Sequence, residues 1–335
     1  MPFYVLTQGI ELTTLHLVMD IKIYSKKDFP AYLPKLNLLY DDLFSGGKGF
    51  RSKLTTMIAK PLQMEESTLQ LLCQTIEFIH NSSLLHDDLI DRSHLRRGKK
   101  AAWLKYSPEY AVLAGDYLLA RVMVNLSTHG NIRLVQYTSE IISDLLEGEW
   151  LQDSVVGDFF ISIEQLDRIH NLKTASLFKW CLRAPFIALN RNDESLHQTL
   201  EELGALLGQL FQRGDDLLDF DIRNDEGKAP LGDLKSGYLN SFGSFIAKDM
   251  KRDQIDQMVK SNSLDDLYQC FSEDVAFGKN IFLQKVQQFD QENQKKIDLY
   301  QHYLKNLSSK LSASEQKMID HLRPLTDLLY WRKRH

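Results

Sequence analysis

The sequence predicts an all-α fold, and three observations support this prediction. Apolar residues recur at helical spacing, as in Leu72, Ile76 and Ile79, and again between Leu203 and Leu210. The strict alternation of apolar and polar residues that is typical of strands is scarce. The 335 residues include 8 prolines and 17 glycines, which leaves room for long uninterrupted helices.

Breaks between the expected helices follow glycine and proline along the chain. They fall at Ser45 to Gly49, around Pro108, and from Arg223 to Gly237, which is the clearest polar loop. We find no internal repeat of about 20 to 50 residues, so an array of repeats is not expected. The sequence therefore predicts a single domain over residues 1–335, with residues 1–30 as a peripheral N-terminal extension.

Composition excludes several classes of function. With 43 % apolar and 25 % charged residues the chain has the composition of a globular protein. A formal charge of −5 gives no bulk attraction to nucleic acid, so no nucleic-acid partner is expected. Three widely separated cysteines indicate neither a disulfide framework nor a zinc site. Because the N-terminus also lacks the pattern of a secretory signal, we expect a cytoplasmic protein.

The segment IEFIHNSSLLHDDLID, residues 76–91, carries the first functional signal. On a helix, Asp87 and Asp91 are four positions apart and lie on one face, with Asp88 beside them. The same face continues back through Ser83 and His80. Two carboxylates are therefore expected to converge at this end of the helix.

The same D-D-x-x-D spacing returns in FQRGDDLLDF, at Asp215, Asp216 and Asp219, with Gln212 before it on the same face. Apolar residues surround both motifs, so their carboxylates should be partly desolvated and should require cations. Two clusters of oxygen ligands suit Mg²⁺, which binds few carboxylates and also takes substrate phosphate oxygens. Either motif alone could be a solvated acidic patch, and the repetition favours a metal and diphosphate site.

Basic residues near these motifs could bind a second anionic substrate without metal. The segment GGKGFR supplies Lys48 and Arg51, with glycines that would let a phosphate approach the backbone. Each cation alone is typical of an ordinary surface, and the significance lies in the set. Its other members are Arg96, Arg97, Lys173 with the adjacent hydroxyl of Thr174, and Lys228.

These segments, in this order, resemble the trans-type polyprenyl synthetase family, which includes the farnesyl, geranylgeranyl and longer-chain prenyl diphosphate synthases. The resemblance extends from Gly46 to about Gly237. It rests on seven blocks, namely GGKGFR, EFIHNSSLLHDDLID with the following RRG, LAGDYLLA, EGEWLQ, LKTASLF, FQRGDDLLDF and GKAPLGDLKSG.

The resemblance implies an isoprenoid-synthase-type bundle of antiparallel helices around a deep central cavity, usually as a homodimer. It implies Mg²⁺ as cofactor, as three ions that bridge the diphosphate. The metal ligands would be Asp87, Asp91 and Asp215, supported by Asp88, Asp216 and Asp219.

The resemblance also assigns the substrates. The allylic diphosphate would be held by Arg96, Lys173 and Lys228, and isopentenyl diphosphate by Lys48, Arg51, His80 and Arg97. Thr174 and Gln212 would line the reacting centre. The implied reaction ionises the allylic diphosphate with the help of the metals, after which the isopentenyl double bond attacks the allylic cation.

Three positions depart from the family pattern. Tyr238 stands where a lysine commonly touches the allylic diphosphate, and Asn240 stands where a threonine is usual. Nearby Lys235 could supply the missing charge. Arg213, inside the second motif, occupies a position that is often apolar, and the sequence offers no explanation for it.

Product length in this family follows from the residues one turn before the first motif, here Ser82 and Ser83. Two small side chains predict an open cavity floor and a product beyond fifteen carbons. The alternative is that these serines only favour tight helix packing. A long product would be poorly soluble, so transient membrane contact for its release is a further hypothesis.

Two other functions remain open. A class I terpene cyclase would bind one diphosphate only, and the isopentenyl diphosphate set argues against it. A non-catalytic subunit of a heteromeric synthase would not need two complete motifs, although Tyr238 favours this alternative. The basic C-terminal residues Arg332 to Arg334 are expected to form a frayed tail.

Overall fold

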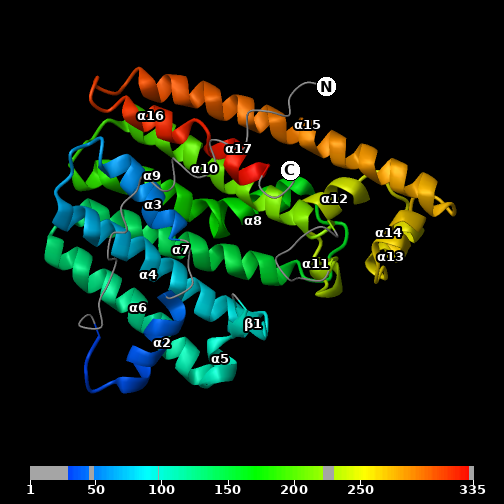
Figure 1. Ribbon diagram of the computed structural model, residues 1–335, viewed down its shortest axis with the longest axis horizontal. Coiled ribbons are helices and arrows are strands. Elements are labelled where there is room, and N and C mark those ends of the chain that lie inside the picture. The colour runs from blue at the N-terminus through cyan, green and yellow to red at the C-terminus, as the bar shows by residue number, and fades with distance from the viewer. Residues whose placement is uncertain (1–28, 45–48, 97, 222–229, 332–335) are drawn as a thin grey trace. The chain divides into compact units, whose positions relative to one another are not determined.

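The computed structural model describes residues 29–44, 49–96, 98–221 and 230–331. This described part is helical throughout, apart from its loops and a two-residue antiparallel hairpin, β1 (Leu95–Arg96) paired with β2 (Lys99–Lys100). The predicted all-α class is therefore confirmed. The chain divides into two compact units, each with its own helices. Figure 1 labels the helices along the chain.

The first unit comprises Met1–Ile142, Lys179–Leu200 and Leu311–His321. Its central pair is α4 and α6, which run side by side, and α3 packs on α4 (Figure 1). The helices that lie wholly within it are α2 (Pro34–Phe44), α3 (Phe50–Ala59), α4 (Glu66–Ile90), α5 (Ala102–Lys105) and α6 (Pro108–His129).

Local sequence sets the ends of α6. Ser107 accepts a hydrogen bond from the Tyr110 amide, and Pro108 occupies the first helical position, where a missing N–H has no cost. The helix ends at Gly130, whose φ of 84° is left-handed and favours glycine. The expected break around Pro108 is thus the start of a helix.

The second unit comprises Ser143–Phe178, Glu201–Lys310 and Leu322–His335. Its longest helix is α15, and α14 packs against it (Figure 1). The helices wholly within it are α8 (Ile163–Lys173), α11 (Gly232–Lys235), α12 (Ser241–Ala247), α13 (Arg252–Val259), α14 (Leu264–Gln269), α15 (Val275–Ser308) and α17 (Leu325–Tyr330).

Four helices have residues in both units, namely α7 (Ile132–Ser154), α9 (Ala175–Ala188), α10 (Glu194–Leu218) and α16 (Lys317–Leu322). The single domain over residues 1–335 stays a prediction.

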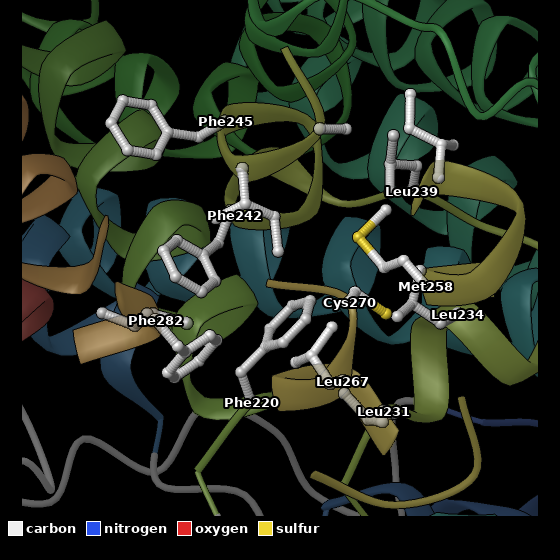
Figure 2. Packing of buried hydrophobic residues seen from close by; sticks show 14 of the residues in the cluster. Phe220, Leu231, Leu234, Leu239, Phe242, Phe245, Met258, Leu267, Cys270 and Phe282 are labelled. Atoms are coloured by element: carbon white, nitrogen blue, oxygen red, sulfur yellow. The ribbon is translucent and has the colours of Figure 1, made fainter. Parts of the chain in front are cut away.

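Aromatic rings dominate the core of the second unit. Phe242 lies 5.1 Å from Phe220 and 5.6 Å from Phe282 between ring centroids, in edge-to-face geometry (Figure 2). Such pairs add about 0.5–1.5 kcal/mol beyond the area they bury. Because Phe220 comes directly after Asp219, this cluster fixes the chain where the second aspartate motif ends.

No helix in the described ranges is long and apolar enough to cross a bilayer. Cys73, Cys181 and Cys270 are buried and unbridged.

Candidate active site

The first aspartate motif lies at the C-terminal end of α4. Asp87 belongs to the last turn and is half-buried, whereas Asp91 caps the helix and is exposed. The Asp91 amide donates to the Asp87 carbonyl oxygen at 2.8 Å, which keeps the two residues one turn apart. Two carboxylates are therefore accessible to a ligand at this helix end.

The middle carboxylate of the first motif, Asp88, is buried. Arg96, on β1, donates to its Oδ1 from Nε at 2.9 Å and also from a terminal guanidinium nitrogen. The Arg96 side chain remains 40 % exposed. Arg96 thus pairs with the motif itself, and its expected role toward the allylic diphosphate stays a prediction.

Arg51 and His80, two residues of the expected isopentenyl diphosphate set, are in direct contact. The Arg51 guanidinium lies 3.0 Å from His80 Nε2, so the ring nitrogen accepts and cannot carry a proton there. Buried Glu77, one turn before His80, accepts from the amide of Ser52 at 3.1 Å. Glu77 therefore satisfies an amide in the first turn of α3 and holds Arg51 against α4.

The two serines of the chain-length prediction have different surroundings. Ser82 is buried and donates to the Gly115 carbonyl oxygen of α6 at 2.9 Å. A Cβ at Gly115 would meet the His86 ring at 2.2 Å, so small residues bring α4 and α6 close. Ser83 is half-buried and donates to the His80 carbonyl oxygen of its own helix at 2.9 Å. These contacts support packing for Ser82 and leave Ser83 as the chain-length candidate.

The second motif lies at the C-terminal end of α10, with Asp215 half-buried and Asp216 buried. Asp216 accepts from the Gln212 side chain and from the Ser241 amide, both at 2.9 Å. Burial raises the pKa of Asp216, and the hydrogen bonds from Ser241 and Gln212 oppose this shift. The middle carboxylate of each motif is therefore buried and hydrogen-bonded.

Thr174 and Gln212 are in direct contact, and their role at the reacting centre stays a prediction. The Thr174 hydroxyl donates to Gln212 Oε1 at 3.0 Å, while the amide nitrogen of Gln212 donates to Asp216. Because the amide oxygen and nitrogen are both used, the orientation of Gln212 is fixed. Thr174 is thereby linked to the second motif through one side chain.

Asp219 anchors the chain that follows the motif. Its two carboxylate oxygens accept from the amides of Gly232 at 2.8 Å and Asp233 at 3.2 Å. Asn240, which replaces the usual threonine, donates to the Asp233 carboxylate at 2.8 Å and to the Asp216 carbonyl oxygen at 3.1 Å. Asn240 also caps α12. The buried side-chain amide of Asn240 thus connects the second motif to α12.

Lys173 forms an ion pair with Glu149 of α7, and both side chains are largely buried. The two helices approach closely because residue 148 is glycine, where a Cβ would lie 2.7 Å from the Lys173 amide nitrogen. The EGEWLQ block signals this position, although no role was predicted for Glu149. The role of Lys173 toward the allylic diphosphate stays a prediction.

His170 is a buried residue that sequence reasoning missed. Its Nε2 lies 3.9 Å from Asp216, beyond hydrogen-bond distance. Burial lowers the pKa of His170 from 6.5 to about 4. The Asp167 carboxylate opposes this shift and the positive charge of Arg213 reinforces it, so the ring is neutral at pH 7. A lone histidine inside an amphipathic helix gives no sequence signal of this environment.

The structure explains the unusual Arg213. Its guanidinium is buried and donates to both carboxylate oxygens of Asp167 at 2.8 Å and to Asn293 at 3.1 Å. Asn293 donates to the Tyr330 hydroxyl at 3.0 Å, and that hydroxyl donates to Asp290 at 2.7 Å. Arg213 therefore joins α8, α10, α15 and α17 within the second unit.

Tyr238, another position that departs from the family pattern, packs against the aromatic core of its unit. Its hydroxyl is buried and has no hydrogen-bond partner among the described residues. Burial, and then the charges of Asp216 and Asp233, raise the pKa of Tyr238. Lys235 donates to the Pro230 carbonyl oxygen at 3.0 Å, so it adds no charge within the core.

Several predicted residues lie outside the described ranges, namely Lys48, Arg97, Lys228 and the basic residues Arg332 to Arg334. Among the described residues, no three histidine, cysteine or carboxylate side chains form a metal site by themselves. Mg²⁺ is commonly held by one or two carboxylates together with water and substrate phosphates. Asp87 and Asp91 in the first unit, and Asp215 in the second unit, are each donors of this type.

All-helical packing and two aspartate motifs with buried middle carboxylates place the chain in a class of helical proteins with paired aspartate-rich motifs. Residues 34–274 match the family model described as polyprenyl synthetase. Because this match covers more than half of the chain, the chain belongs to the polyprenyl synthetase family. The predicted family is thus confirmed.

Similar proteins agree with this assignment. The chain is 33 % identical to octaprenyl diphosphate synthase of Escherichia coli over 193 residues, which are 57 % of this chain and 59 % of that protein. It is 33 % identical to decaprenyl-diphosphate synthase of Dictyostelium discoideum, over 70 % of this chain and 50 % of that protein. The matched part therefore spans less than two thirds of these relatives.

A solved structure gives the fold across nearly the whole chain. The crystal structure of a decaprenyl diphosphate synthase from Rhodobacter capsulatus has a TM-score of 0.79 at 25 % identity and covers 97 % of both chains. The chain accordingly has the isoprenoid-synthase-type helical fold.

Proposed function

We propose that this protein is a Mg²⁺-dependent prenyltransferase that joins isopentenyl diphosphate head-to-tail to an allylic diphosphate. The observation that carries the proposal is that two aspartate motifs with the same internal arrangement occur in a member of the polyprenyl synthetase family. In each motif the middle aspartate is buried in hydrogen bonds, and Asp87, Asp91 and Asp215 are at least partly accessible.

These three residues would hold Mg²⁺, in agreement with the oxygen ligands that this ion prefers. When bound, the metal would supply positive charge that makes the diphosphate a better leaving group. We propose that three such ions would bind together with the diphosphate.

The residues of the chain orient the reaction. Thr174 and Gln212, fixed by their hydrogen bond, would line the reacting centre, and Lys173 and Arg96 would bind the allylic diphosphate together with Lys228. The carbon–oxygen bond of this substrate breaks and its electron pair leaves on diphosphate. The isopentenyl double bond forms the new carbon–carbon bond, and loss of a proton to the released diphosphate restores an alkene.

The Arg51–His80 pair supports a second substrate. A guanidinium held by a neutral histidine retains its full positive charge and can bind a diphosphate without metal. With Lys48 and Arg97 it would bind isopentenyl diphosphate. A terpene cyclase has one diphosphate substrate and would not need this pair.

The proposed product is a long all-trans polyprenyl diphosphate. The relatives named octaprenyl and decaprenyl diphosphate synthase support this length, as does the small Ser83. A homodimer, a cytoplasmic location and transient membrane contact for product release are further parts of the proposal.

Chain-length analysis tests the proposal. Purified protein is incubated with Mg²⁺, labelled isopentenyl diphosphate and, separately, geranyl, farnesyl or geranylgeranyl diphosphate. We expect products above twenty carbons, whereas a stop at fifteen or twenty carbons would refute the long product.

A second candidate is a non-catalytic subunit of a heteromeric synthase, favoured by Tyr238, which places a neutral side chain where a lysine is common. No incorporation with any primer, from protein with a native circular dichroism spectrum, would favour this candidate.

A further inference from the structure

The C-terminal helix α17 contacts α10 directly beside the second aspartate motif. The contact is at Gly214, which immediately precedes Asp215. A Cβ there would lie 3.1 Å from the carbonyl oxygens of Leu329 and Tyr330, the last two residues of α17. Ordinary van der Waals contact is wider than this, so glycine allows the end of α17 to lie on the backbone of α10. The turn that carries Asp215 is therefore in contact with α17.

Tyr330 also connects α17 to the side chain of Arg213. The Tyr330 side chain is fully buried, and its hydroxyl donates to Asp290 at 2.7 Å. The hydroxyl accepts from the side-chain nitrogen of Asn293 at 3.0 Å, and the oxygen of the same amide accepts from Arg213 at 3.1 Å. Because Asn293 uses both ends of its amide, its orientation is fixed. One buried side chain thus separates the Tyr330 hydroxyl from Arg213.

Helices α8 and α15 hold Arg213 as well. Its guanidinium donates to both carboxylate oxygens of Asp167 at 2.8 Å. Lys296 of α15 donates to Asp167 at 3.3 Å and to Gln209 at 2.8 Å. Gln209 and Arg213 are one turn apart on α10, and the second motif begins just after them. Side chains from α8, α15 and α17 therefore fix the last turns of α10.

Stability alone is a weak explanation for this network. Well-packed apolar residues of similar volume are often as stable as a buried ion pair. Hydrogen bonds add direction, because each donor and acceptor is satisfied only within a narrow range of geometries. The network reaches α10 at Arg213 and Gly214, immediately before Asp215, so the arrangement that it fixes is that of the second motif.

We propose that Tyr330 is a positioning residue for the second aspartate motif. Its hydroxyl fixes Asn293 and, through it, Arg213, so that the last turn of α10 presents Asp215 in one direction. Tyr330 acts through these side chains and not by contact with substrate. The consequence for metal binding rests on the proposed function, whereas the effect on α10 does not.

Hydrogen–deuterium exchange tests the effect on α10. Tyr330→Phe removes the hydroxyl and keeps the ring in its apolar contacts. We expect about fivefold faster exchange of the amides in residues 209–218, since one hydrogen bond corresponds to about this factor. The matched control is Tyr300→Phe, because Tyr300 is an equally buried tyrosine of the second unit whose hydroxyl donates to the Leu322 carbonyl oxygen at 2.9 Å. Exchange in residues 209–218 should be unchanged in the control.

The Mg²⁺ dependence of ligand binding separates positioning from stability. A non-ionisable allylic diphosphate analogue is titrated by calorimetry at a series of Mg²⁺ concentrations. We expect Tyr330→Phe to raise the Mg²⁺ concentration at half-maximal binding about fivefold, and Tyr300→Phe to leave it unchanged. A purely structural role would lower the melting temperature without moving this concentration.

A double variant tests the route from Tyr330 to the motif. Asn293→Ala removes the side chain that links Tyr330 to Arg213. Adding Tyr330→Phe to Asn293→Ala should therefore raise the Mg²⁺ concentration at half-maximal binding no further than Asn293→Ala alone. Additive shifts would show that Tyr330 does not act through Asn293, and would overturn the proposal.

Two further results would overturn it. One is unchanged exchange of residues 209–218 in Tyr330→Phe. The other is an unchanged Mg²⁺ concentration with a lowered melting temperature, which would make Tyr330 a residue of stability only. If the wild-type protein neither transferred prenyl groups nor bound the analogue, the proposed function would fail, and the exchange measurement would still decide whether Tyr330 positions α10.

Discussion

The two aspartate motifs have the same spacing but different support. At the first motif, the middle carboxylate is held by one partly exposed arginine from a two-residue strand. At the second, Asp216 accepts from Gln212 and Ser241, and Asp219 holds the amides that begin α11. Equal sequence patterns therefore do not imply equal support for the middle carboxylate, which one arginine provides at the first motif and an amide side chain and a backbone amide provide at the second.

The largest expected difference between the units concerns their arginines. Arg213→Met leaves the partly buried Asp167 without its main partner, so we expect a loss of about 3–5 kcal/mol in the free energy of unfolding. Arg191→Met is the matched change in the first unit, where the pair with Glu315 is 39 % exposed on the arginine side, and we expect about 0–1 kcal/mol. Urea denaturation measures both, and equal losses would contradict the comparison.

The next effect concerns catalysis. Asp87→Ala and Asp215→Ala each remove a proposed metal ligand, and we expect each to lower the rate of isopentenyl incorporation about 10²–10³-fold. Circular dichroism and denaturation midpoints provide the control for folding. Full activity of either variant would remove that motif from the metal site.

A smaller effect is the pH dependence of stability that we expect from His170, which lies beside the second motif. Since the pKa of His170 is about 4 in the folded protein and 6.5 in the unfolded chain, the unfolded chain binds more protons between these values. Stability should therefore fall as the pH drops below about 6.5, by about 1.4 kcal/mol at pH 5.5 from this residue alone.

The variant His170→Gln should lack this component, which the difference in unfolding free energy between pH 8 and pH 5.5 measures. His129→Gln changes an exposed histidine at the end of α6 and serves as the control. The same pH dependence in wild type and His170→Gln would show that burial of His170 does not control it.

The smallest expected effect tests the hydrogen bonds of the second motif. Thr174→Val removes the donor to Gln212, and a loss of about 1 kcal/mol corresponds to about a fivefold lower kcat/KM. Ser139→Ala removes an exposed hydroxyl that donates to the Val135 carbonyl oxygen and to Met123 Sδ rather than to Gln212, and its kcat/KM should be unchanged. A Thr174→Val enzyme as active as wild type would exclude Thr174 from the reacting centre.

Much of this arrangement could be predicted from the sequence. Helical period and the two D-D-x-x-D motifs are local or strongly patterned signals. The Arg51–His80 and Thr174–Gln212 contacts join residues far apart in the chain, and no pattern in the sequence predicts them. The helix boundary at Pro108 was marked, although only the structure identifies it as a start rather than an end.

Other features depend on contacts between residues far apart in the chain. Arg213 was unexplained because its partners Asp167 and Asn293 lie on two other helices, and no local spacing connects them. Glu149 and His170 acquire their environments from helix packing for the same reason. Ser82 could serve the cavity or the packing, and its bond to the Gly115 carbonyl oxygen supports packing.

Calorimetric binding of a non-ionisable allylic diphosphate analogue most directly tests whether both motifs act on one diphosphate. The titration compares wild type, Asp87→Ala and Asp215→Ala, each with Mg²⁺ and with EDTA. We expect Mg²⁺-dependent binding to the wild type and at least 10²-fold weaker binding to each variant. Wild-type affinity in either variant, or tight binding in EDTA, would contradict a site in which the two motifs share one metal-bound diphosphate.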